Sequence, residues 1–275
     1  MNTSPALTTE ESRGTLVYLY GVAPGDAPDP AADLRGVDGG AVRLVRAGAL
    51  AGIVGDVPSS EYAEDRLNER LRDLDWVGER GVAHERVLTW YADRGPVVPL
   101  SLFSLHTDDA RVRERMAERA GPLAATLQRV AGRREWGIKV WRDDARLRAQ
   151  LETQSDALRA LTAEIRAASE GRRYLLARKR DTLEREEMRR ISAAAAREAL
   201  DVIGAAAEQT ATIPIPPGAS GTAARTLVLH AAFLVPQQDY TRFESAVRTL
   251  GAAQAERGFD WEFTGPWPPY HFTTS

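Results

Sequence analysis

The sequence predicts an α+β fold in two domains, and three observations support this. The chain has 275 residues, more than the roughly 100 to 200 residues of a usual single domain. With 43% hydrophobic residues, 27% charged residues and a net charge of −3, its composition is that of an ordinary globular protein, without the overall positive charge typical of nucleic-acid binding. Apolar runs of strand character alternate with segments of helical period, as in an α+β fold.

The N-terminal region predicts a tail followed by one α+β domain. Residues 1–14 lack the charged and apolar order of a signal peptide, so we expect a disordered tail. Residues 15–132 are expected to form the N-terminal α+β domain. Its expected strands are a buried strand at 15–22, a hairpin at 42–57 and a strand at 97–105. Its expected helices are at 60–94, with a possible break at Gly78 to Gly81, and at 112–130, bent or divided at Gly121 and Pro122.

Residues 133–275 are expected to form the second domain. A strand at 135–141 precedes a helical hairpin at 142–209, in which leucines recur every three, four or seven residues and Gly171 separates the arms. Proline and glycine make 210–224 linker-like. A strand at 227–235, a helix at 239–254 and a strand from 259 to 263 follow. This order predicts a modified ferredoxin-like sheet with its helices on one face.

The residue types argue against catalysis, cofactors and metals. Without cysteine the chain has no thiol nucleophile, disulfide or sulfur-ligated metal, which suits a reducing cytosol. His84, His106, His230 and His271 are far apart and lack metal-ligand spacing, so we expect structural or surface roles for them. No serine elbow or phosphate-binding glycine loop occurs, and the aspartate pairs at 108–109 and 143–144 suit helix starts.

The distribution of charge argues against nucleic acid as a partner, and the short length of the apolar runs argues against a membrane. Residues 172–190 hold eight basic and four acidic side chains, but Tyr174 is the only aromatic residue there that could stack on a base. We therefore expect a solvated or protein-docking face and no nucleic acid. Because about 18 apolar residues never run without a charge, we expect no membrane span.

Four segments in order resemble the GvpL/GvpF family of gas vesicle proteins. They are Tyr18-Leu19-Tyr20-Gly21, residues 84–105 with Pro99, Glu135-Trp136-Gly137-Ile138-Lys139-Val140, and Thr264-Gly265-Pro266-Trp267-Pro268-Pro269-Tyr270. The last is the most specific, and residues 172–176 also look like the family's central helix. The family's usual Arg and Gly are missing after Pro99, where the chain has Leu100, Ser101 and Leu102.

The resemblance implies a function in gas vesicle formation, without catalysis. It implies a cytoplasmic, gas-vesicle-associated accessory or minor structural protein that contacts the apolar shell subunit and other accessory proteins. Residues 265–270 would then either pack Trp267 against the second sheet, which we expect, or present a recognition surface. A ferredoxin-like small-molecule-binding or regulatory module is the alternative function, and an enzyme using scattered carboxylates is a third.

Overall fold

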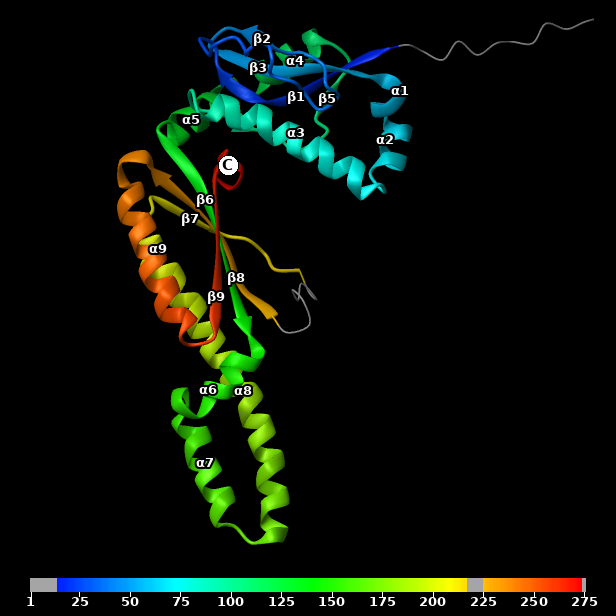
Figure 1. The fold of residues 1–275 in the computed structure, drawn as a ribbon. Coiled ribbons are helices and arrows are strands. Elements are labelled where there is room, and N and C mark those ends of the chain that lie inside the picture. Colours follow the sequence, from blue (N-terminus) through cyan, green and yellow to red (C-terminus); the bar gives the residue numbers. More distant parts are fainter. Residues whose placement is uncertain (1–13, 217–224, 274–275) are drawn as a thin grey trace, which may run out of the picture. The chain divides into compact units, whose positions relative to one another are not determined.

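The computed structural model describes residues 14–216 and 225–273 (Figure 1). The chain divides into two compact units, unit 1 with residues 1–132 and 268–275, and unit 2 with residues 133–267. The sequence predicts that residues 268–275 belong to the second domain, whereas residues 268–273 pack with unit 1 in the structure. Apart from Gly14, the expected disordered tail of residues 1–14 lies outside the described residues.

Unit 1 is built on an antiparallel sheet in the order β2-β3-β1-β4, with β5 also paired to β1. Its strands are β1 (Thr15–Pro24), β2 (Val42–Ala47), β3 (Leu50–Pro58), β4 (Val98–Pro99) and β5 (Leu105–His106). β2 and β3 form the expected hairpin, which turns through Gly48 at a φ of +61°. The prediction of a single strand over 97–105 is wrong. β4 and β5 are two-residue strands, separated by a loop in which Phe103 has a φ of +62°.

Helices pack on both faces of this sheet. They are α1 (Ser59–Tyr62), α2 (Glu64–Arg70), α3 (Leu74–Ala92), α4 (Asp109–Glu118) and α5 (Ala120–Val130). Tyr18 and Tyr20 pack with α3 in one apolar cluster, while Val17 and Leu19 pack with α4 and α5 in another, as alternation along a strand requires. The possible break at Gly78 to Gly81 is wrong, because α3 is continuous there; an interior glycine costs a helix only about 1 kcal/mol.

Unit 2 contains the second antiparallel sheet, in the order β7-β8-β6-β9. Its elements are β6 (Arg133–Asp143), α6 (Asp144–Gln154), α7 (Asp156–Ala167), α8 (Glu170–Gly204), β7 (Gln209–Thr212), β8 (Arg225–Pro236), a 3-10 turn (Gln237–Asp239), α9 (Tyr240–Ala255) and β9 (Phe259–Trp267). Numbered within the unit, the strands follow the order 2-3-1-4 of a ferredoxin-like sheet. The α+β prediction is confirmed. β7 completes this order, and it replaces the start of the expected linker at 210–224.

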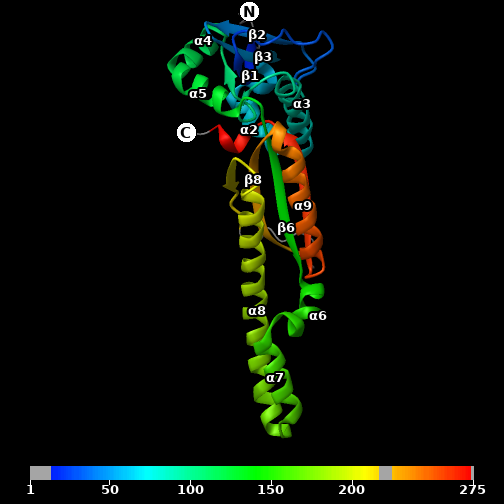
Figure 2. The same cartoon turned by 90° about the vertical axis from the view of Figure 1, so that its left-hand side faces the viewer.

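Helices α8 and α9 cover one face of this sheet (Figure 1). Ile138 and Phe233 of the strands pack there against Ala195 of α8 and Phe243 of α9. Figure 2 shows α8 extending past the sheet, with α7 beside its first half. The expected hairpin is present, but its first arm is divided between α6 and α7 because Ser155 caps a new helix start. Among the described residues, no helix is both long and apolar enough to cross a membrane.

Candidate functional site

Tyr18 and Tyr20, the first two motif residues, are fully buried in unit 1. The Tyr18 hydroxyl lies 2.9 Å from Nδ1 of His84 on α3 and accepts the Phe103 N–H at 3.1 Å. The Tyr20 hydroxyl accepts the Val37 N–H at 2.8 Å. Burial raises the pKa of both tyrosines, which keeps the hydroxyls protonated. These side chains therefore join β1 to α3 and to two loops, and they offer no surface to a partner.

Gly21 and Pro99, the next two motif residues, are cross-strand neighbours in β1 and β4. A Cβ atom on Gly21 would lie 2.7 Å from the Val98 carbonyl oxygen and 2.9 Å from a Leu88 methyl group. Only glycine permits this approach without displacing β4 or α3. Pro99 has no N–H to donate, which is tolerated in a strand as short as β4. The pair thus fixes β4 at the side of β1.

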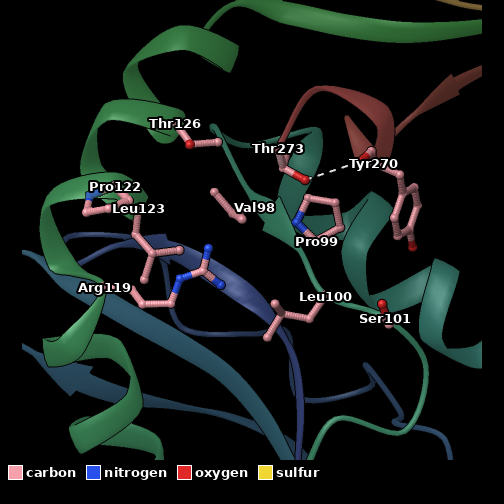
Figure 3. Close-up of a pocket in the computed structure, with 10 residues that line it drawn as sticks. All are labelled: Val98, Pro99, Leu100, Ser101, Arg119, Pro122, Leu123, Thr126, Tyr270 and Thr273. Carbon is pink, nitrogen blue, oxygen red and sulfur yellow. Dashed lines mark hydrogen bonds between the residues drawn. The ribbon is translucent and has the colours of Figure 1, made fainter. Parts of the chain in front are cut away.

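Pro99 and Tyr270 line one pocket of unit 1, although they are far apart in the sequence (Figure 3). The pocket has a volume of about 190 Å³ and is lined by Val98, Pro99, Leu100, Ser101, Arg119, Pro122, Leu123, Thr126, Tyr270 and Thr273. Tyr270 turns its ring away from the centre and donates its hydroxyl to Glu85 of α3 at 2.8 Å. Thr273 donates to the Tyr270 carbonyl oxygen at 3.2 Å, which closes that side.

The pocket combines apolar walls with one cation and several hydroxyl groups. Arg119, between α4 and α5, extends its side chain into it (Figure 3) and has no ion-pair partner within 14–216 and 225–273. Small-molecule sites commonly measure roughly 300 to 1,000 Å³, so this pocket is small for a cofactor. Its size and lining suit an apolar side chain of a protein partner next to a carboxylate that pairs with Arg119.

The C-terminal motif and the Glu135-Trp136-Gly137 motif are cross-strand neighbours in unit 2. Glu135 pairs with Trp267, and Gly137 with Thr264, across an irregularity in the ladder between β6 and β9. A Cβ atom on Gly137 would lie 2.7 Å from the Thr264 hydroxyl, and one on Gly265 would lie 3.0 Å from the Glu135 carbonyl oxygen. Gly265 also has a φ of +122°, and the peptide bond to Pro266 is cis. Gly265 is therefore required by its positive φ and by close backbone contact, whereas Gly137 leaves room for the Thr264 side chain.

The expected burial of Trp267 is wrong. Its side chain is 39% exposed, and its Nε1 donates to the Thr264 hydroxyl at 3.1 Å. Trp136 instead supplies the packed indole, stacked on Tyr240 of α9 at 4.7 Å and on Phe263 of β9 at 5.0 Å between ring centroids. The reason is the irregularity in the ladder between β6 and β9. Phe263 pairs with Ile138, on the face that packs with α8 and α9, but β9 has one extra residue between Thr264 and Trp267. Trp267 therefore pairs with Glu135, on the opposite face.

The last motif residues belong to unit 1. Pro268 and Pro269 are buried, Tyr270 reaches Glu85, and the buried Phe272 follows. Arg129 of α5 donates to the Phe272 carbonyl oxygen at 3.0 Å. The motif at 265–270 is therefore shared, with an exposed tryptophan in unit 2 and a buried anchor in unit 1.

Three of the titratable residues considered from the sequence, His84, Asp108 and Asp143, have structural roles. His84 is buried, and burial lowers its pKa to about 4, so the imidazole is neutral near pH 7. Asp108 and Asp143 accept backbone N–H groups at the starts of α4 and α6, at 2.9 and 2.8 Å, which confirms the prediction for both aspartate pairs. Within the described part of the chain, no three His, Cys, Asp or Glu side chains are grouped to hold a metal ion.

Sequence reasoning missed most of the residues that form the pocket. Arg119, Leu123 and Thr126 come from the α4–α5 region, which has no motif, and only the tertiary structure brings them to Pro99. The bend expected at Gly121 and Pro122 was the one available signal.

Comparison with known proteins covers nearly the whole chain. The family model for gas vesicle synthesis protein GvpL/GvpF matches residues 16–274. Gas vesicle protein L of Streptomyces sp. is 32% identical over 95% of this chain and 94% of its own length. Gas vesicle protein L2 of Halobacterium salinarum is 26% identical over 87% of this chain and 84% of its own length.

Solved structures show the same fold. The gas vesicle protein GvpF of Anabaena sp. PCC7120 matches with a TM-score of 0.66 at 18% identity, over 95% of this chain and 97% of that one. GvpF of Microcystis aeruginosa matches with a TM-score of 0.65 at 18% identity, over 94% of this chain and 99% of that one. With the family model matched from residue 16 to residue 274, the chain belongs to the GvpL/GvpF family of gas vesicle synthesis proteins.

Proposed function

We propose that this chain is a non-catalytic accessory protein that binds the apolar shell subunit of gas vesicles and supports assembly of the vesicle wall in the cytoplasm. A shell subunit with a large apolar face tends to aggregate in water until it is assembled. A protein that holds apolar side chains of the subunit would keep that face covered. Other gas vesicle accessory proteins are further expected partners.

The observation that carries this proposal is the pocket lined by Pro99 and Tyr270. Its walls are apolar, its mouth contains the exposed Arg119 and Ser101, and its volume of about 190 Å³ suits a side chain. An apolar centre with a polar rim is the usual composition of a protein interface. Membership of a family of gas vesicle synthesis proteins supports another gas vesicle protein as the partner, and the apolar shell subunit is the partner that we propose.

Co-purification of the tagged chain with co-expressed shell subunit tests the proposal. Ser101→Trp should fill the pocket mouth and Arg119→Glu should repel a carboxylate, so both variants should retain less shell subunit at an unchanged unfolding temperature. Ser245→Trp and Arg248→Glu make the same changes at exposed positions of α9 and serve as controls. Equal retention by all four variants would remove the pocket from the interface. If the wild-type chain itself retains no shell subunit, at low or at high salt, the proposed function is rejected.

A second cavity of unit 1 favours the alternative of a small-molecule-binding module. It measures about 420 Å³ and is walled by Pro24, Pro28, Pro96 and Tyr91, with Asp26 and Arg94 among its lining. This volume lies in the usual range of ligand sites. A screen of cellular metabolites by thermal shift, repeated with Arg94→Ala, tests this function. A ligand that stabilises the wild-type chain but not the variant would support it.

A further inference from the structure

Two exposed patches of opposite charge each carry apolar side chains at their centre. We define the basic patch as Tyr174, Leu175, Arg178 and Lys179 of α8, and the acidic patch as Leu74, Asp75, Gly78, Glu79 and Val82 of α3.

The basic patch lies near the start of α8, where this helix packs beside α7. Tyr174 and Leu175 are each 67% exposed, which is unusual for large apolar side chains. Arg178 and Lys179 follow them by four residues, so all four share one helix face. Residues 171–180 contain five basic side chains and no acidic one. Among the described residues neither Arg178 nor Lys179 has an ion-pair partner, whereas Arg172 pairs with Glu164 at 2.7 Å.

The acidic patch lies on the first turns of α3. Leu74 is 81% exposed and Val82 is 63% exposed. Together with Gly78 they recur every four residues, and an added Cβ atom on Gly78 would meet nothing within 4 Å. The notch left by this glycine gives room for a protruding side chain. Residues 73–79 contain three acidic side chains and no basic one, and Asp75 and Glu79 lie along one side of the apolar row. Glu79 pairs with the neighbouring Arg80 at 2.9 Å, and Asp75 has no ion-pair partner among the described residues.

We infer that the basic patch of one copy docks on the acidic patch of a second copy of this chain. Charge complementarity carries this inference: the chain has a net charge of only −3, yet Arg178 and Lys179 lie together on one exposed helical surface, and Asp75 and Glu79 lie together on another. Each surface has exposed apolar residues, so contact buries them and brings Arg178 and Lys179 to Asp75 and Glu79. The apolar centre supplies affinity, and the charges select the partner surface.

The contact is heterologous, because each copy uses two different surfaces. A pair of copies therefore leaves one basic and one acidic patch unused, and association continues until a ring closes or the supply of copies ends. The mass of the purified chain should rise with protein concentration beyond that of a dimer. It should fall as salt increases, since exposed charges are screened over about 10 Å at 0.1 M.

Charge reversal tests the contact in the full chain by light scattering at low salt. Arg178→Glu with Lys179→Glu makes both patches negative, and Asp75→Arg with Glu79→Arg makes both positive. Each variant alone should associate about tenfold or more weakly. An equimolar mixture of the two should associate like the wild-type chain, because each patch again finds an opposite charge on the other variant. As a control, Arg242→Glu with Arg248→Glu reverses two positive charges, as in the Arg178→Glu and Lys179→Glu variant, but at exposed positions of α9. This control should leave association unchanged.

The mixture of the two charge-reversed variants separates docking between copies from misfolding. Recovery in the mixture supports docking between copies and shows that both variants are folded. A monomeric wild-type chain at every concentration, or two folded variants whose mixture stays monomeric, overturns the proposal. If the monomeric chain instead retains DNA or RNA through Arg178 and Lys179, the basic patch is a nucleic-acid site.

Discussion

At the scale of single residues, His84 makes the stability of unit 1 depend on pH. Burial lowers the pKa of His84 from 6.5 to about 4, so the unfolded chain takes up this proton at a higher pH than the folded chain. The free energy of unfolding therefore rises as pH increases from about 4 to about 6.5, by roughly 3 kcal/mol in all. This contribution is fully present above 6.5 and is lost as pH falls towards 4.

His84→Gln should flatten this part of the pH profile, measured by urea unfolding from pH 4 to 7. A His84→Gln chain with the wild-type slope would show that other groups cause the pH dependence.

The two tryptophans of the paired motifs should differ in their effect on stability. Trp136 stacks on two rings, so Trp136→Ala should lower the free energy of unfolding by about 3 kcal/mol or more. Trp267 is 39% exposed, and Trp267→Ala should cost about 1 kcal/mol. Chemical denaturation of both variants measures the difference. Equal losses would place the Trp267 ring in a packed environment.

At the scale of elements, the hairpin of unit 2 depends on the cap between α6 and α7. The buried Ser155 accepts the Leu158 N–H at 3.2 Å, whereas Ser169 at the start of α8 makes no such bond. Ser155→Ala should therefore destabilise α7 by about 1 kcal/mol. Hydrogen exchange of residues 156–167 should become faster in this variant. Ser169→Ala is the matched control, and the same acceleration in both would refute the role of the cap.

The elements show which features follow from sequence and which do not. Strands at Tyr18 and Ile138 were predictable because apolar runs or alternation require a buried face. β7 was missed because Gln-Thr-Ala-Thr is short and polar, and its pairing with β8 comes from tertiary structure. The composition of the pocket was equally hidden, since Arg119 and Tyr270 meet only after folding. The predicted burial of Trp267 was wrong because the face of β9 to which this indole points depends on the irregularity in the ladder with β6, which the sequence does not reveal.

At the scale of the whole molecule, the chain should unfold in two parts. Phe272 is buried in unit 1 and Phe259 is buried in unit 2. Phe272→Ala should reduce the hydrogen-exchange protection of residues 15–132 and leave residues 133–267 unchanged, at a cost of about 3 to 5 kcal/mol. Phe259→Ala should give the opposite pattern. Loss of protection throughout the chain in either variant would show that the units unfold as one.

The position of residues 268–273 has a consequence for synthesis of the chain. Tyr270 and Thr273 line the pocket of unit 1, yet the ribosome makes them only after residues 133–267. At typical elongation rates those residues take roughly 7 to 27 s to translate. A nascent chain therefore presents an open, unfinished pocket during that interval. Under the proposed function, translation order thus delays capture of a partner by this pocket until the whole of the inserted unit has been made.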